Sequence, residues 1–217
     1  MARHLIPVSV LFLAVVLGGR LLGLPGAGPL AVALSCALAV FLVRRAGEGW
    51  DALGLARRTP WWRTLLVGVG LALLGYAVAV AATLLAVRGL GWAPMQLDRL
   101  AGVQGSLPGL LGMLAIAWTT AALGEELLFR GFLQGRLQRL FGDGRGAGLA
   151  AAGVQALLFG LAHAYQGPTG VLVSGSLGLC FGWAMLRTRS LWPLVVAHGL
   201  IDTLSLLALY AGALPTA

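Results

Sequence analysis

Two adjacent carboxylates followed by an arginine, in Glu125-Glu126-Leu-Leu-Phe-Arg130, have a spacing that suits acid–base chemistry. On a helix, Glu126 and Arg130 stand four residues apart and can form an ion pair. Glu125 then lies about 100° around the helix, away from that partner. Two adjacent carboxylates in a medium of low dielectric constant do not both ionise cheaply, so we expect their proton affinities to differ. One would stay charged beside Arg130 and the other could act as a base towards water; the alternative is a solvated helix end near lipid headgroups.

Two further polar motifs repeat the spacing of four residues. Phe159 and His163 would share one helix face, and so would His198 and Asp202. Asp202 could accept a hydrogen bond from His198 and so fix its tautomer. Taken singly, each motif is also typical of a structural feature, either a hydrogen-bonded histidine or a polar pair that holds helices together.

The elements that carry these residues are strongly apolar. Of 217 residues, 59% are hydrophobic and 10% are charged, whereas soluble domains are about 45–50% apolar and about 25% charged. Such a chain needs lipid as its solvent, so we predict an all-α, polytopic transmembrane helical bundle. Ionisable groups at bilayer depth are costly and mark functional sites. Five of them lie in or beside apolar segments: Glu125, Glu126, His163, His198 and Asp202.

Seven segments are long and apolar enough to span a membrane, which takes about 20 residues, and six or eight spans are possible. They lie near residues 5–24, 28–43, 64–88, 108–130, 147–165, 168–187 and 191–212. No strong helix breaker follows the fourth segment before residue 142, so this helix is predicted to continue to Phe141. The small residues Ser174, Gly178 and Gly182 predict close helix packing. We therefore separate residues 1–107, with three spans and interfacial loops, from residues 108–217, with about four.

The net charge is +8, and all 15 basic residues are arginine. They lie between apolar spans rather than on one polar face, which argues against nucleic acid and favours the headgroups of a lipid bilayer. Their distribution predicts a cytoplasmic amino terminus and a multi-pass protein of the cell (inner) membrane. The two cysteines, Cys36 and Cys180, fall in apolar segments and indicate buried thiols. The oligomeric state is left open.

Together the three motifs are far more specific than each alone. Glu-Glu-x-x-x-Arg, Phe-x-x-x-His and His-x-x-x-Asp occur in that order on separate apolar helices. In this they resemble the type II CAAX prenyl endopeptidases and their bacterial relatives, the CAAX protease and bacteriocin-processing (CPBP) group, also called Abi. The resemblance covers roughly residues 108–210. It implies that residues 108–217 are a catalytic core that hydrolyses a peptide bond within the membrane.

The resemblance also implies roles for the acidic motif and the first histidine. Glu125 matches the glutamate that activates the attacking water. Glu126 and Arg130 match the companion acid and the arginine that shape the site. His163 matches the histidine that assists with the water. Such a division of labour agrees with general-base catalysis by a positioned carboxylate.

His198 and Asp202 match the pair that stabilises the developing oxyanion, which is usually the largest single contribution to catalysis. The family often has Asn where this chain has Asp202. An ionised Asp only accepts hydrogen bonds, whereas Asn can donate through its amide. We therefore expect Asp202 to orient His198, which would be the donor to the oxyanion.

A simple zigzag of spans does not bring all these residues together. Glu125 and His198 would lie towards the cytoplasmic side, where we expect the site to open, but His163 would lie near the outer end of the fifth span. The three can meet only if the fourth or fifth span is tilted, bent or displaced along the chain.

Three rival interpretations stay open. Zinc could be bound by Glu125, His163 and His198, although the chain lacks His-Glu-x-x-His and we favour a site without metal or other cofactor. A proton-coupled transporter would predict inverted repeats, and residues 1–107 do not match residues 108–217. A catalytically idle membrane scaffold or chaperone of the same family is the third.

The substrate class follows from the resemblance only in outline: a peptide or a membrane-anchored protein. The arginine-only composition, rich in Ala, Gly and Leu, suggests a prokaryotic source of high GC content, in which prenylated CAAX proteins are not expected. A pheromone precursor, a bacteriocin leader or a membrane-anchored regulator would fit equally well.

Overall fold

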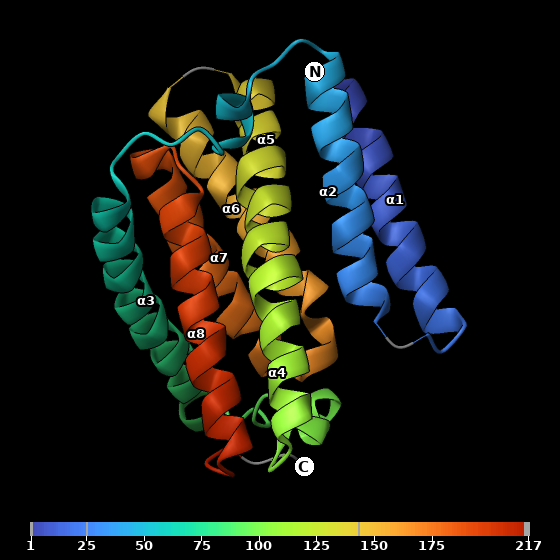
Figure 1. Cartoon of the computed structure of the whole chain (residues 1–217), viewed down its shortest axis with the longest axis vertical. Helices are drawn as coiled ribbons and strands as arrows, with labels where there is room; N and C mark the ends of the chain where they lie inside the picture. Colours follow the sequence, from blue (N-terminus) through green and yellow to red (C-terminus); the bar gives the residue numbers. More distant parts are fainter. Residues whose placement is uncertain (1, 25, 143, 215–217) are drawn as a thin grey trace.

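A computed structural model of the chain describes residues 2–24, 26–142 and 144–214 (Figure 1). Within these ranges the chain forms helices joined by turns and loops, without a β-strand, and seven of the helices are long and apolar enough to cross a membrane. The all-α class and the seven spans are therefore confirmed. The spanning helices are α1 (Ala2–Leu21), α2 (Ala27–Arg45), α3 (Trp61–Leu84), a composite helix over Leu107–Phe141, α6 (Arg145–Ala162), α7 (Gly167–Thr188) and α8 (Trp192–Tyr210).

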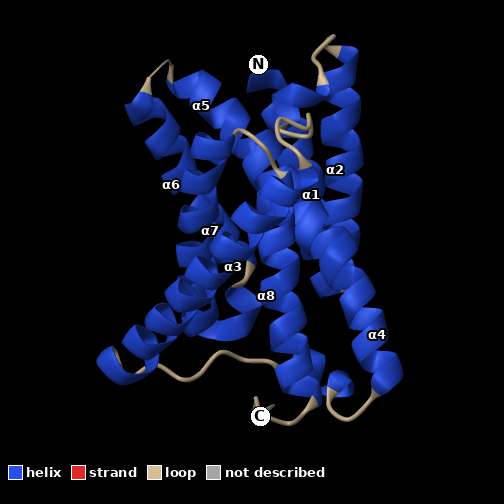
Figure 2. Cartoon of the chain, turned by 60° about the vertical axis from the view of Figure 1, so that its left-hand side comes forward, coloured by secondary structure: helices blue, strands red, loops and turns tan. Residues whose placement is uncertain are grey.

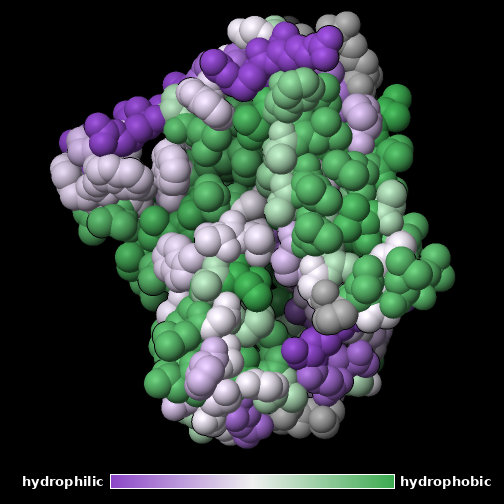
Figure 3. Space-filling model, turned by 45° about the vertical axis from the view of Figure 1, so that its right-hand side comes forward, coloured by the Kyte–Doolittle hydropathy of each residue, from purple (hydrophilic) through white to green (hydrophobic). Residues whose placement is uncertain are grey.

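Successive spans run in opposite directions through the bundle, and the two ends of the chain lie at opposite ends of the molecule (Figure 1). On the face shown in Figure 3, most apolar side chains lie in the middle, while the most hydrophilic ones gather towards the two ends. Many large apolar side chains are exposed, for example Leu73 at 70% and Leu66 at 65% on α3. Exposure on this scale fits lipid as the surrounding solvent. The assignment of one end to the cytoplasm stays a prediction.

The fourth span is the longest helix, running without interruption over Leu107–Phe141, so its predicted extension to Phe141 is confirmed. It starts at Ser106, whose hydroxyl accepts a hydrogen bond of 3.2 Å from the amide of Gly109, and it consists of α4 (Leu107–Ile116), a π-helical segment (Ala117–Gln134) and α5 (Gly135–Phe141). Gly142 ends it with a φ of 103°, a conformation that favours glycine. Stretches of π-helix are rare and often mark functional sites. Here the widened turns carry both glutamates and Arg130.

Helices α6 and α7 pack at backbone distance through small residues. A Cβ on Gly178 would lie 3.0 Å from the Cα of Ala156, and one on Gly160 would lie 2.7 Å from the carbonyl oxygen of Val171. The side chain of Gln155 donates to the carbonyl of Gly178 at 2.7 Å. The predicted packing role of the small-residue stripe on α7 is thereby confirmed.

Replacing Gly160 with alanine is expected to destabilise the protein by about 1–3 kcal/mol, because the added methyl group must push α7 away. Alanine has a higher helix propensity than glycine, so propensity alone would stabilise the variant. A lower melting temperature would therefore show that the packing against α7 dominates. Gly153, on the same helix, is the matched control, since a Cβ there meets no atom within 4 Å. Thermal unfolding of both variants in detergent tests the prediction, and equal melting temperatures would contradict it.

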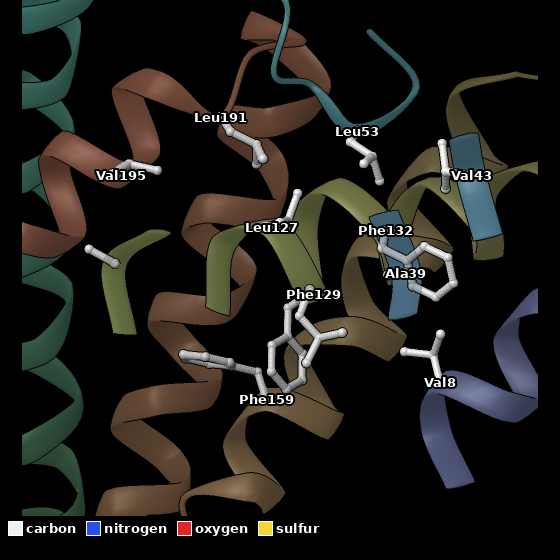
Figure 4. Close-up of a cluster of buried hydrophobic side chains, with 12 residues drawn as sticks. Val8, Ala39, Val43, Leu53, Leu127, Phe129, Phe132, Phe159, Leu191 and Val195 are labelled. Carbon is white, nitrogen blue, oxygen red and sulfur yellow. The ribbon is translucent and has the colours of Figure 1, made fainter. Parts of the chain in front are cut away.

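A buried cluster joins the amino-terminal helices to the rest of the bundle (Figure 4). Phe129 lies at its centre, with its ring centroid 6.2 Å from that of Phe12 on α1 and 5.0 Å from that of Phe159 on α6. The same cluster contains Val43 of α2 and Leu53 of the short 3-10 helix Trp50–Leu53. Residues 1–107 and 108–217 therefore share one apolar core.

The turn that connects α6 to α7 lies higher in the bundle than the lower ends of α3, α4 and α8 (Figure 1). It consists of a 3-10 turn over Ala164–Gln166. The long loop that joins α3 to α4 crosses the lower part of the molecule (Figure 2). It hydrogen-bonds to this turn, from the Gln96 amide to the Gln166 carbonyl at 3.0 Å. The Thr169 hydroxyl also donates to the Ala93 carbonyl at 2.6 Å. Helix α6 therefore stops before the end of the bundle, so His163 lies deeper along the bundle than a simple zigzag of spans predicts.

At the opposite end, Glu48 joins the loop after α2 to α5. Its carboxylate pairs with Arg136 at 2.7 Å and with Arg139 at 2.6 Å. Burial raises the pKa of Glu48, but hydrogen bonds from the two arginines outweigh burial and hold it below its usual value. The amino-terminal hairpin is therefore anchored to the fourth span by an ion pair as well as by the apolar core.

Candidate active site

Glu126 is the centre of the polar cluster. Its side chain is fully buried, and its Oε1 atom accepts from Arg130 Nη1 at 3.1 Å and from His198 Nδ1 at 2.8 Å. The pair predicted from the spacing of Glu126 and Arg130 is therefore present. The link to His198 joins the π-helical segment to α8. Both contacts are made through Oε1, while Oε2 is buried without a hydrogen-bond partner among the described residues, so Glu126 holds the guanidinium and the imidazole through one oxygen.

Arg130 is also buried, and two aromatic rings hold its guanidinium. Its Cζ atom lies 4.2 Å from the ring centroid of Phe159 on α6 and 5.6 Å from that of Phe181 on α7. Cation–π contacts of this kind gain strength where water is excluded. Arg130 therefore ties three spans together at the level of the glutamates.

His198 lies between two carboxylates. Its Nδ1 atom is bound to Glu126, and its Nε2 atom is 3.6 Å from Oδ2 of Asp202. That second distance exceeds a hydrogen bond, so Glu126, rather than the expected Asp202, makes the short contact that orients His198. Because a carboxylate accepts, Nδ1 carries the proton. The Nε2 atom faces the side of Asp202.

A small cavity of about 30 Å³ adjoins this histidine. Its volume suits one or two water molecules. The side chains around it come from the fourth span, α6, α7 and α8, and they are Arg130, Phe159, Leu177, Phe181, His198, Ile201 and Asp202. A polar group entering this space would meet a guanidinium, an imidazole and a carboxylate.

His163 stands where α6 ends, and its ring is fixed by its own helix. The Nδ1 atom lies 2.9 Å from the carbonyl oxygen of Phe159, and the two ring centroids are 4.6 Å apart. A carbonyl only accepts, so Nδ1 carries the proton and Nε2 of the neutral ring has a lone pair. Nε2 has no hydrogen bond to another described residue. Phe159 also lies 6.5 Å from the ring of His198, so one phenylalanine contacts both histidines.

Glu125 is half-buried, and it has neither a hydrogen bond nor an ion pair with any described residue. It lies close enough to His198, Asp202 and Tyr165 to interact with them electrostatically. The two adjacent glutamates therefore differ as the sequence predicts: one is held by Arg130, and the other keeps its carboxylate available.

Two residues near Glu125 lie outside the three motifs. Cys36 of α2 donates to the carbonyl of Gly124 at 3.1 Å, which brings the amino-terminal hairpin beside the glutamates. Tyr165 stacks on His163, with ring centroids 5.9 Å apart and an interplanar angle of 29°. Cys36 is partly buried, in agreement with the prediction for it. Tyr165 gave no sequence signal except its place two residues after His163.

The described residues contain no group of three His, Cys, Asp or Glu side chains arranged to hold a metal ion. Glu125, His163 and His198, the ligands considered for zinc, surround the site without forming such a cluster.

Fold and site together define a multi-pass membrane protein whose helices enclose a cluster of acids and histidines. Residues 107–204 match the family model described as Type II CAAX prenyl endopeptidase Rce1-like. The resemblance inferred from the motifs is confirmed, since the match covers the residues that carry all three motifs. The family supports a CAAX-protease-like function in the membrane. No curated protein and no solved structure matches the chain.

Proposed function

We propose that the protein is an intramembrane endopeptidase that hydrolyses a peptide bond with a water molecule activated by Glu125. The observation that carries the proposal is the division between the two glutamates. Glu126 is occupied by Arg130 and His198, whereas Glu125 has a free carboxylate at the same site. A positioned carboxylate at a site that excludes bulk water is suited to act as a general base.

In the proposed reaction, Glu125 takes a proton from water while the water oxygen attacks the scissile carbonyl carbon. The carbonyl oxygen becomes an oxyanion, and the C–N bond then breaks. The proton held by Glu125 passes to the leaving nitrogen, so the products are a carboxylic acid and an amine. His163 offers a lone pair on Nε2 to orient the water, since Nδ1 is bound to Phe159.

His198 is the proposed donor to the oxyanion. With Nδ1 bound to Glu126, a protonated ring presents its second N–H from Nε2. Asp202 lies on the same side as Nε2, with its Oδ2 atom 3.6 Å away. A donor fixed before the reaction begins stabilises the transition state without reorganisation. Asp202 is thus a positioning residue in this mechanism.

The substrate we propose is a peptide or membrane-anchored protein that reaches the site from the lipid or from the cytoplasm. We infer from the distribution of arginines that the protein lies in the cell membrane with its amino terminus in the cytoplasm. The competing enzyme hypothesis is a zinc peptidase in which Glu125, His163 and His198 are ligands. The competing hypothesis without catalysis is a scaffold that binds another membrane protein.

Purified protein in detergent is expected to cleave at least one member of a panel of quenched-fluorescent peptides that includes farnesylated CAAX sequences. Cleavage should survive a zinc chelator, because no step of the proposed reaction uses a metal. Loss of activity with chelator and recovery with added zinc would instead support the zinc peptidase. Cleavage of none of the peptides, in detergent or in liposomes, would favour the scaffold.

A further inference from the structure

The aromatic ring of Tyr165 contacts both a cation and the candidate water-orienting histidine. Its ring stacks on His163 at 5.9 Å, and the guanidinium of Arg99 lies 4.6 Å from its centroid. Arg99 and Tyr165 are both accessible to solvent at the surface, whereas His163 is half-buried. Tyr165 thus links an exposed cation to a half-buried histidine, and we call these three side chains the outer stack.

Arg99 belongs to the loop between α3 and α4, in the 3-10 helix Asp98–Val103. This loop is fastened to the chain that follows His163 by the hydrogen bonds to Gln166 and from Thr169. A third hydrogen bond, from the Gly105 amide to the Tyr210 carbonyl at 3.1 Å, holds the loop to the end of α8. The loop is therefore attached on both sides of the outer stack.

His163 needs such support because the helix stops there. Its backbone has left the helical conformation, with φ −94° and ψ 14°, and a 3-10 turn follows. The only hydrogen bond on its ring that involves a described residue is the one from Nδ1 to Phe159. One hydrogen bond fixes the tautomer, and the ring of Phe159 packs against the imidazole with centroids 4.6 Å apart. A second aromatic ring, that of Tyr165, restrains the tilt of the imidazole further.

Tyr165 is also close to the acids of the site. It interacts electrostatically with Glu125 and Asp202, so the ring that supports His163 stands beside the carboxylate proposed as the base. We propose that Tyr165 is a positioning residue that holds His163 towards Glu125, and that Arg99 of the α3–α4 loop holds Tyr165 in turn. This inference rests on the proposed function for its consequence in catalysis, but the geometry of the stack can be tested without it.

Because displacements of about 1 Å at a site can cost about 100-fold in rate, we expect Tyr165→Ala to lower kcat by about 10- to 100-fold with KM nearly unchanged. Tyr165→Phe keeps the ring and should retain most of the activity. Arg99→Gln removes one exposed cation–π contact, so a decrease of about two- to fivefold is expected. Tyr76, half-exposed on α3, provides the control variant Tyr76→Ala.

The stack itself is tested by NMR on protein labelled with ¹³C at histidine. The chain has three histidines, and His163→Gln assigns one ring signal. Tyr165→Ala should shift that signal, because a stacked ring changes the field at its neighbour, whereas Tyr165→Phe and Tyr76→Ala should leave it nearly in place. Arg99→Gln should shift it in the same direction as Tyr165→Ala but less.

Each outcome bears on the inference. An unmoved His163 signal in Tyr165→Ala would show that the stack does not hold this ring. A moved signal with unchanged kcat would show that the stack exists but does not position a catalytic group. If the wild-type protein cleaves no peptide, the proposed function fails and the role of Tyr165 in catalysis fails with it, while the NMR shift still decides whether the stack holds His163.

Discussion

Replacing Glu125 with glutamine is expected to lower kcat by about 10²–10⁴-fold, the usual contribution of a positioned general base. Glutamine has nearly the same shape but cannot take a proton from water at neutral pH. Glu125 has no hydrogen-bond or ion-pair partner among the described residues, so the substitution breaks no structural contact. KM and the melting temperature should therefore stay close to their wild-type values.

Steady-state kinetics on the best cleaved peptide, together with thermal unfolding in the same detergent, measure these quantities. The control is Asp51→Asn, which removes an exposed carboxylate from the 3-10 helix Trp50–Leu53. It should match the wild type in both assays. A Glu125→Gln variant with full activity would remove Glu125 from the mechanism, and one that loses activity only by unfolding would make it a structural residue.

Arg130→Met is expected to lower the free energy of unfolding by about 3–5 kcal/mol, the usual cost of removing one partner from a buried ion pair. The carboxylate of Glu126 is fully buried and would keep only His198 as a partner. The guanidinium between Phe159 and Phe181 would also be lost, and methionine fills only part of that space. The variant should therefore unfold at a clearly lower temperature whatever its activity.

A double-mutant cycle with Glu126→Gln separates the ion pair from the loss of packing. If the pair dominates, the double variant should be more stable than the sum of the single effects predicts. Arg139→Gln is the matched control, because Arg139 is 38% exposed and its pair with Glu48 lies near the surface. It should cost no more than about 1 kcal/mol. A similar effect of Arg130→Met and Arg139→Gln would contradict the buried pair as a source of stability.

These two predictions assign opposite phenotypes to residues on consecutive turns of one helix. Loss of Glu125 should remove activity and leave the fold intact, whereas loss of Arg130 should weaken the fold. The difference arises because only Glu126 is four residues from Arg130 and within reach of His198 on α8. The spacing of four residues is visible in the sequence, whereas the contact with His198 is not.

The sequence by itself determined the features that depend on local pattern. Seven apolar segments define seven spans, because each must bury its backbone polar groups in its own helix when lipid is the solvent. The pairing of Glu126 with Arg130 follows from helical spacing, and the length of the fourth span follows from the absence of a breaker before Gly142. The order of the three motifs was enough to predict the family of residues 107–204.

Only the tertiary structure decided which groups from different helices meet. It paired His198 with Glu126 at 2.8 Å and left Asp202 at 3.6 Å, and it placed the turn after His163 above the lower ends of α3, α4 and α8. It also placed Tyr165 and Arg99 against that histidine. The physical reason is that helix tilt, helix ends and loop paths depend on packing between distant residues, such as the close approach of α6 to α7 at Gly160. Periodicity within one segment carries no information about its neighbours in space.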